Sequence, residues 1–193
     1  MVLSRLVLAT ANPDKVVEIS ALLPGTELVP RPAHIPEVIE DGDTLEANAL
    51  LKAHAICAAT GSAAVADDTG LEVMALGGAP GVWSARFAGE NATYADNVAK
   101  LVADLEGQAE RAARFRTVAV IVTPDGEEIV VDGVTHGTIA TEPMGSKGFG
   151  YDPVFIPDDG DGRVYAQMTL AEKNKLSQRG RAFRALAAAL DLG

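Results

Sequence analysis

Short apolar runs in this chain alternate with segments that carry helix-start signals, and that alternation narrows the choice of fold. The run Arg5–Thr10 is apolar and β-prone, and Asn12, Pro13 and Asp14 follow it. Asn is a good N-cap, Pro suits the first helical position, and Asp suits the positive end of a helix. The sequence therefore predicts a strand followed by a helix that ends near Leu23.

The middle of the chain repeats this pattern. A strand is expected at residues 28–29, an irregular acidic loop at 30–43, and a helix that begins in the capping-box-like segment 43–46 and ends at Gly61. The remaining expectations for this half are an apolar strand at 63–66 that stops at Asp67, an extended segment at 71–76, and a helix at 93–105.

The second half predicts a hairpin, made of strands 115–123 and 127–132 around a Pro-Asp-Gly turn. Further strands are expected at 134–140 and 153–156, a short helix opened by a capping box at 169–172, and an amphipathic helix at 181–190. Because helices alternate with strands early and a hairpin comes later, we expect an α/β fold with a mixed sheet flanked by helices. The length fits one domain, residues 1–193.

The charge balance excludes several kinds of partner. Sixteen Lys plus Arg stand against 27 Asp plus Glu, which gives a net charge of −11. Nucleic acids are bound mainly by neutralising their phosphates with basic side chains, so no nucleic-acid partner is expected. A free nucleotide remains possible, since a few local cations and a metal can offset its charge.

The cellular location follows from what the sequence contains. No apolar run approaches the roughly 20 residues that span a bilayer, and Met1–Thr10 lacks the features of a signal peptide. The single cysteine, Cys57, cannot form an internal disulfide. We therefore expect a soluble, cytoplasmic protein with no membrane partner.

The first candidate site is the junction that contains Thr10, Asn12 and Lys15. A helix N-terminus offers N–H groups and a partial positive charge to a phosphate, and Lys15 adds a point charge. The alternative is an ordinary capped helix with a solvated lysine, and for this segment taken alone it is the better interpretation.

Acidic residues form the second candidate. Asp67 and Asp68 follow an apolar strand, where open α/β sheets place their sites, and they suit Mg²⁺ or a general base. Neighbouring strand residues point to opposite faces, so their roles can differ. The alternative is an Asp-rich turn. The loop 40–43 is interpreted as a solvated loop with a helix cap at Asp43, unless it meets Asp68 and shares a cation with it.

Two later segments are also candidates. The glycine-rich loop 145–153 carries Phe149 and Tyr151, which can stack on a base or instead pack onto the core. In the segment 172–179, Lys173 and Ser177 share a face if the helix continues through them. The alternative there is a charged helix exterior.

These segments form an ordered set of motifs. They are Thr10-x-Asn12-x-x-Lys15, Glu40-x-Gly42, Glu46-x-Asn48-Ala49, residues 66–71 (Ala-Asp-Asp-Thr-Gly-Leu), 77–81 (Gly-Gly-Ala-Pro-Gly), 84–89 (Ser-Ala-Arg-Phe-Ala-Gly), 149–153 (Phe-Gly-Tyr-Asp-Pro), 172–174 (Glu-Lys-Asn) and 177–179 (Ser-Gln-Arg). The set closely resembles the inosine triphosphate pyrophosphatase family, the dITP/XTP pyrophosphatases, over nearly the whole chain.

The resemblance implies an elongated two-lobed α/β fold with a long, bent mixed sheet, an active-site cleft between the lobes, a homodimer and a Mg²⁺ requirement. It assigns the triphosphate to Thr10, Asn12 and Lys15, the metal to Glu40 and Asp68, and water activation to Asp68. Thr69 is implied as a hydrogen-bond donor to substrate. The residues implied at the base and sugar end are Phe149, Gly150, Tyr151, Asp152, Lys173, Gln178 and Arg179.

The implied reaction is hydrolysis of dITP, ITP or XTP to the monophosphate and pyrophosphate. Lys173 and Arg179 can donate to the 6-oxo group of the base and would face the amino group of adenine unpaired. At position 178 this chain has Gln where the family commonly has His. The alternative to a role of Gln178 in base binding is a side chain that points to solvent. The rival functions are a related pyrophosphatase for other modified nucleotides and a nucleotide-sensing module without turnover, against which the paired aspartates argue.

Overall fold

The computed structural model describes residues 4–190. Its helices are α1 (Pro13–Leu22), α2 (Leu45–Thr60), α3 (Tyr94–Asp104), α4 (Leu170–Leu176) and α5 (Gln178–Ala189). Its strands are β1 (Arg5–Leu8), β2 (Glu27–Val29), β3 (Ala64–Val73), β4 (Pro80–Gly81), β5 (Ala112–Val122), β6 (Glu128–Ile139) and β7 (Phe155–Pro157), with short 3-10 turns at Met74–Leu76, Ser84–Arg86 and Tyr165–Gln167. In this described range, no helix is both long and apolar enough to cross a lipid bilayer.

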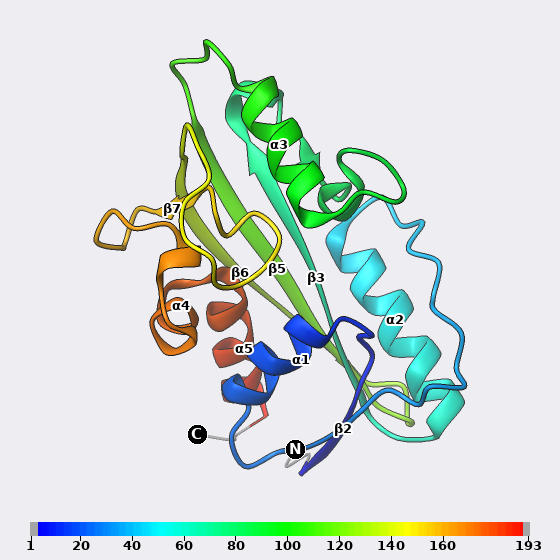
Figure 1. The fold of residues 1–193 in the computed structure, drawn as a ribbon. Helices are drawn as coiled ribbons and strands as arrows, with labels where there is room; N and C mark the ends of the chain where they lie inside the picture. Colours follow the sequence, from blue (N-terminus) through cyan, green and yellow to red (C-terminus); the bar gives the residue numbers. More distant parts are fainter. Residues whose placement is uncertain (1–3, 191–193) are drawn as a thin grey trace. The chain divides into compact units, whose positions relative to one another are not determined.

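The strands form one mixed seven-stranded sheet in the order β2-β1-β3-β5-β6-β7, with β4 beside β3 (Figure 1). Strand β1 runs parallel to β2 and to β3, and Leu8 lies opposite Val65. Strands β4 and β7 are antiparallel to β3 and β6. The expected mixed α/β fold with flanking helices is confirmed.

The chain divides into two compact units. Among the described residues, unit 1 contains 4–68, 117–133 and 179–190, and unit 2 contains 69–116 and 134–178. Strands β3, β5 and β6 each contribute residues to both units.

In unit 1, helices α1 and α5 pack against the same apolar sheet residues. The buried residues of this core include Leu6 and Leu8 of β1, Val65 of β3, Ala119 and Ile121 of β5, Ile19 of α1, and Phe183 and Leu186 of α5. Helix α2 lies on the other side of these strands in Figure 1. Because strand side chains alternate between faces, successive residues of one strand can meet different helices.

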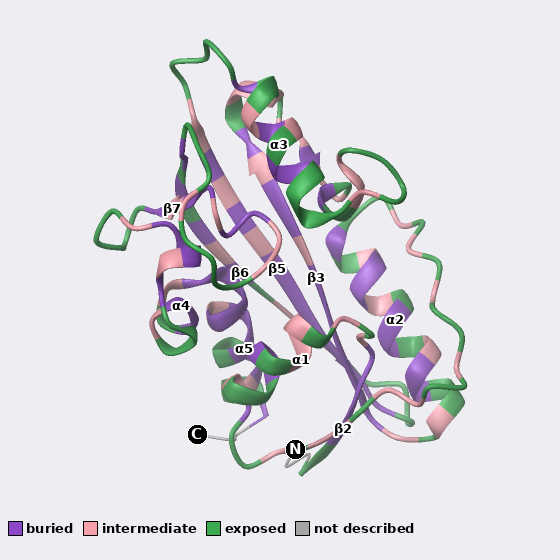
Figure 2. Ribbon diagram, viewed as in Figure 1, coloured by how far each residue is buried: buried purple, intermediate pink, exposed green. Residues whose placement is uncertain are grey.

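In unit 2, helix α3 and several aromatic rings cover the sheet. Phe115 packs edge-on against Phe155 with ring centroids 4.7 Å apart, and Tyr165 lies 5.2 Å from Phe155. Val98 and Leu101 of α3 join the same core, while the opposite side of α3 is exposed (Figure 2). Tyr151 of the glycine-rich loop is itself buried in this core.

Two predicted strand breaks are wrong. Strand β3 runs without interruption from Ala64 to Val73 through both aspartates, where the sequence predicted a strand at 63–66 and a separate extended segment at 71–76. The strand can continue because each buried carboxylate has a cationic partner, Lys52 for Asp68 and Arg179 for Asp67. Strand β6 likewise spans 128–139 as one element, with the alternating burial of a half-exposed strand.

Two predictions about helix ends also need correction. Thr44, not Asp43, caps α2, because the Thr44 side chain accepts the N–H of Ala47 at 3.1 Å. Helix α4 ends at Leu176, and Ser177 follows it with extended backbone angles, so Lys173 and Ser177 do not share a continuous helical face. The caps predicted at Asn12, at Gly61 and at Thr169 are confirmed.

Candidate functional site

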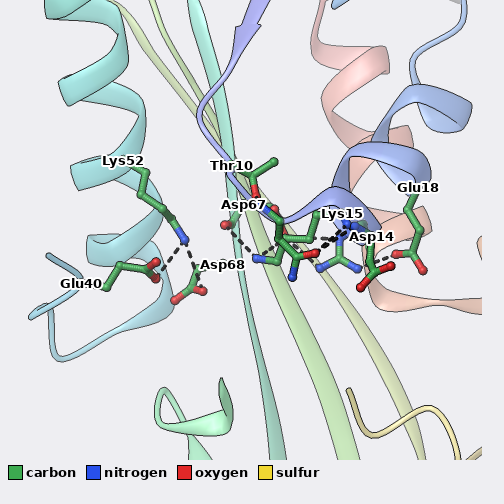
Figure 3. Close-up of polar contacts among 10 residues, drawn as sticks. Thr10, Asp14, Lys15, Glu18, Glu40, Lys52, Asp67 and Asp68 are labelled. Atoms are coloured by element: carbon green, nitrogen blue, oxygen red, sulfur yellow. Dashed lines mark hydrogen bonds and ion pairs between the residues drawn. The ribbon is translucent and has the colours of Figure 1, made fainter. Parts of the chain in front are cut away.

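Asp67 and Asp68 point to opposite faces of β3 and enter two different charge clusters, both in unit 1 (Figure 3). Asp67 meets residues of α1 and α5. Asp68 meets Lys52 of α2. The alternation of a strand therefore gives two neighbouring carboxylates separate surroundings, as the sequence predicted.

Asp67 belongs to a buried cluster of two carboxylates and two cations. Its Oδ2 lies 3.3 Å from Lys15 Nζ and 3.0 Å from Arg179 Nη2. The Nη1 of Arg179 also contacts Glu18 at 2.5 Å. Burial by itself would raise the pKa of Asp67, but the charges of Lys15 and Arg179 outweigh it, so this pKa lies well below its ordinary value. Asp67 is held ionised.

The position of Lys15 follows from local structure. Because β1 is parallel to β3, the N-terminus of α1, which follows β1, lies next to Asp67. The Asn12 side chain caps this helix by accepting the N–H of Asp14 at 2.9 Å, and the Thr10 hydroxyl accepts the N–H of Asn12 at 3.1 Å. Thr10 and Asn12 thus hold the turn that carries Lys15.

Asp68 belongs to a smaller cluster with a net charge of −1. The Nζ of Lys52 lies 3.5 Å from Asp68 Oδ1 and 3.0 Å from Glu40 Oε2. Figure 3 shows Lys52 reaching down from α2 between the two carboxylates. Burial raises the pKa of Asp68 above its ordinary value. The positive charges of Lys52 and Lys15 oppose this shift, the negative charges of Glu40 and Asp67 add to it, and the net shift is upward. Asp68 is therefore the more basic member of the acidic pair.

Glu40 and Asp68 are a fitting pair for a hard cation. Both carboxylates already face one positively charged group, Lys52 Nζ. Mg²⁺ prefers oxygen ligands and is commonly held by one or two carboxylates together with water and substrate phosphates. Across residues 4–190 no group of three His, Cys, Asp or Glu side chains is arranged to hold a metal, so a complete protein cage is not expected.

Unit 2 contains a second buried ion pair, between Lys173 and Asp152. The ammonium of Lys173 lies 4.8 Å from the centroid of the Phe149 ring and 5.6 Å from that of Tyr165. Asp152 also accepts the N–H of Phe149 at 2.9 Å. A Cβ at Gly148 would lie 1.9 Å from Asp152 Oδ2, so only glycine allows the loop to approach this carboxylate.

The other predicted residues lie as follows. Thr69 is half-buried in β3 directly after Asp68, and Gly150 has a positive φ of 61° within the aromatic loop. Gln178, predicted at the base end, begins α5 and is only 4% exposed, so the alternative position in solvent is wrong. Arg179 lies in unit 1, where its bonds to Asp67 and Glu18 tie α5 to β3 and α1.

Sequence reasoning missed Lys52 and Glu18. Lys52 lies on the buried stripe of α2, between Ala49 and Ala53, and a lysine is almost never buried unless it is paired. The helical period of that stripe was a usable signal. Glu18 gave no comparable signal, because its partner Arg179 is 161 positions away in the sequence.

Fold and site together define an α/β protein in which one strand supplies a carboxylate to each of two charge clusters. Asp67 lies in a cluster with Lys15, Arg179 and Glu18, and Asp68 lies in a cluster with Lys52 and Glu40. The Ham1 family model matches residues 6–189, and the chain belongs to the Ham1 family. A dITP/XTP pyrophosphatase of Streptomyces coelicolor is 47% identical over 95% of this chain and 96% of that protein. One from Bacillus licheniformis is 42% identical over 98% and 99%.

Solved structures agree. A HAM1 protein from Coxiella burnetii matches with a TM-score of 0.89 at 36% identity and covers 100% of both chains. A nucleoside-triphosphatase / dITP/XTP pyrophosphatase from Mycobacterium abscessus matches with a TM-score of 0.73 at 44% identity, over 94% of this chain and 97% of that one.

Proposed function

We propose that this protein is a Mg²⁺-dependent enzyme that hydrolyses aberrant purine nucleoside triphosphates (dITP, ITP and XTP) to the monophosphate and pyrophosphate. The observation that carries the proposal is that the two neighbouring aspartates of β3 have different charged partners. Asp67 pairs with the cations Lys15 and Arg179, while Asp68 and Glu40 both face Lys52. In the proposal, Asp68 and Glu40 serve as the oxygen ligands of Mg²⁺. The names of the relatives support the same reaction.

In the proposed reaction, Asp68 accepts a proton from a water molecule whose oxygen attacks the α-phosphorus. The bond between the α-phosphorus and the bridging oxygen breaks, and pyrophosphate leaves with the bonding electron pair. Lys15 and the N-terminus of α1 bind the triphosphate and stabilise the leaving group. Mg²⁺ held by Glu40 and Asp68 would supply a positive charge that offsets charge developing on the phosphates.

Asp68, and not Asp67, suits the base. Asp67 is ionised, but its Oδ2 is bonded to Arg179 and paired with Lys15, which makes it a poor proton acceptor. The raised pKa of Asp68 moves it toward the neutral range, where a general base works best. Paired carboxylates of such different character favour turnover over a nucleotide-sensing role.

The base-binding part of the proposal rests on unit 2. Lys173 is positioned by Asp152 and lies over the Phe149 ring, so it can donate to a 6-oxo group beside an aromatic surface. Phe149, Gly150 and Tyr151 would contact the base, Thr69 would donate to the substrate, and Arg179 is assigned to the same end by the resemblance. A homodimer and a cytoplasmic location stay predictions from the sequence.

The reaction is tested with a panel of nucleotides. Incubated with Mg²⁺, the protein is expected to convert XTP and dITP to monophosphate and pyrophosphate far faster than ATP or dCTP, and chelation of Mg²⁺ should stop turnover. Products are identified by ion-exchange chromatography. Release of orthophosphate and a nucleoside diphosphate would contradict the proposed cleavage position. Equal rates on all bases would contradict the proposed base selectivity. Faster turnover of modified pyrimidine nucleotides would favour the rival pyrophosphatase.

Gln178 is expected to contribute to base discrimination. Among the described residues its buried Oε1 has no hydrogen-bond partner, and an acceptor oxygen matches the N1–H donor of a 6-oxopurine but not the N1 acceptor of adenine. Gln178→Ala should lower the ratio of kcat/KM for dITP over dATP. The corresponding free-energy difference between the two substrates should fall by about 1–3 kcal/mol, the cost of one buried polar partner.

The control for this prediction is Gln108→Ala, which changes an exposed glutamine and should leave the ratio unaltered. A second variant, Gln178→His, should keep activity and acquire a pH dependence near neutrality, where histidine titrates. Both variants are assayed with dITP and dATP at several pH values. Ratios and pH profiles identical to the wild type would place Gln178 outside the base site.

A further inference from the structure

Two helices of this protein begin with the same local arrangement, one in each unit. Helix α2 is capped by Thr44 and has Asn48 four residues later, and α3 is capped by Thr93 and has Asn97 four residues later. Each asparagine is 2% exposed and donates its own backbone N–H to the threonine carbonyl at 3.1 Å. The side chains are therefore set at equivalent positions on the first turn.

Both asparagines use the side-chain oxygen to hold the loop that precedes their helix. Asn48 Oδ1 accepts the N–H of Gly42 at 2.8 Å, and Asn97 Oδ1 accepts the N–H of Ala88 at 2.8 Å. Helical side chains tilt toward the N-terminus, so this position naturally covers the incoming chain. A buried Asn there fixes the loop backbone by a directional bond.

The loop held by Asn48 carries Glu40, two residues before Gly42. A Cβ at Gly42 would lie 2.7 Å from Asn48 Oδ1 and 2.8 Å from Ala47 Cβ, so the loop lies directly against α2. One turn further along the same helix, Lys52 contacts the Glu40 carboxylate at 3.0 Å. The segment 30–43 contains no regular element, so this anchor sets where Glu40 can lie.

The loop held by Asn97 carries Ser84. Asn97 also donates to the carbonyl of Ala85 at 3.0 Å, which fixes the backbone on both sides of the turn. The Ser84 carbonyl accepts the hydroxyl of Tyr151 at 2.8 Å, and the Ser84 hydroxyl accepts the N–H of Leu71 at 2.9 Å. Tyr151 directly precedes Asp152, the partner of Lys173.

We propose that Asn48 and Asn97 are positioning residues with separate targets: Asn48 places the metal-binding carboxylate Glu40, and Asn97 places Tyr151 and the base-binding loop. This inference rests on the proposed function. It goes further by assigning metal binding and base discrimination to two separate asparagines that occupy the same position on their helices and each bind the preceding loop.

The experiment compares Asn48→Ala with Asn97→Ala. Mn²⁺ binding is measured by titration calorimetry without nucleotide, and the dITP over dATP ratio of kcat/KM is measured at saturating metal. Asn48→Ala should weaken Mn²⁺ binding by about tenfold or more, as loss of a partner that orients a ligand does, and leave the base ratio unaltered. Asn97→Ala should leave Mn²⁺ binding unaltered and narrow the base ratio by about tenfold.

Each variant serves as the control for the other, because both remove a side-chain bond to the preceding loop from the same helical position. The positioning role is overturned if the two asparagine variants change Mn²⁺ affinity and the dITP over dATP ratio to the same extent. It is also overturned if Asn48→Ala leaves Mn²⁺ affinity unaltered and Asn97→Ala leaves the ratio unaltered. If either protein fails to fold, Gly42→Ala disturbs the Asn48 contact from the loop side, and Tyr151→Phe removes the bond between Tyr151 and the loop that Asn97 holds. These two variants should give the same separation. A wild-type protein that binds no Mn²⁺ without nucleotide overturns the metal-placing role of Asn48. A wild-type protein that releases no pyrophosphate from dITP, or shows no base preference, contradicts the proposed function itself.

Discussion

Replacing Asp68 with Asn is expected to lower kcat by at least about 100-fold, because the change removes a general base and weakens a metal ligand. Stability should not fall. The folded-state pKa of Asp68 is raised, so its charged form is disfavoured by folding at neutral pH. A neutral Asn removes that cost, while Lys52 keeps its contact with Glu40 at 3.0 Å.

Two measurements check this prediction. Steady-state turnover of dITP gives kcat, and thermal unfolding without nucleotide gives the midpoint temperature, which should be equal to or above that of the wild type. Near-normal turnover would mean that Asp68 is not the base. A fall of several degrees in the midpoint would contradict its assignment as a carboxylate whose charged form is disfavoured by folding.

Replacing Asp67 with Asn, in contrast, is expected to lower the stability of the fold strongly. Asp67→Asn leaves Lys15 and Arg179 buried with Glu18 as the remaining carboxylate of the cluster, and the cluster changes from neutral to a charge of +1. Breaking a buried ion pair from one side costs about 3–5 kcal/mol. For a protein of 193 residues, this corresponds to a fall in the unfolding midpoint of roughly 6–20 °C.

The pH dependence distinguishes this loss from a packing defect. The folded-state pKa of Asp67 is depressed, so its contribution to stability is fully present above the unfolded-state pKa, about 3.9, and is lost as pH falls toward the folded-state value. The difference in unfolding free energy between wild type and Asp67→Asn should therefore be constant near neutrality and shrink below about pH 4. Denaturant titrations at several pH values measure it. A difference that is independent of pH would point to packing alone.

Much of the fold could be predicted from the sequence because its signals are local. The caps at Asn12 and Thr169 and the C-cap at Gly61 depend on contacts within a few residues, and all three form as predicted. The interruption predicted in β3 was wrong because the continuity of this strand depends on contacts with distant residues. Two adjacent aspartates look like a turn until their partners on other elements are known.

At the site too, some features could be predicted from local sequence signals and others depend on distant contacts. The motif order was sufficient to select Lys15, Glu40 and Asp68 as candidate site residues, and alternation along a strand was sufficient to predict that the two aspartates have different surroundings. The identity of those surroundings was not predictable. Lys52 meets Glu40 across 12 positions of sequence, and Arg179 meets Asp67 across 112.

The sequence by itself determined the fold class, the family and the residues around which the site is built, since these depend on local propensities and on an ordered set of motifs. Only the tertiary structure decided which aspartate is neutralised by Lys15 and Arg179 and which stays with Glu40. The reason is physical: the pKa of a buried carboxylate is set by its burial and by the charges around it, and folding brings those charges from distant parts of the chain.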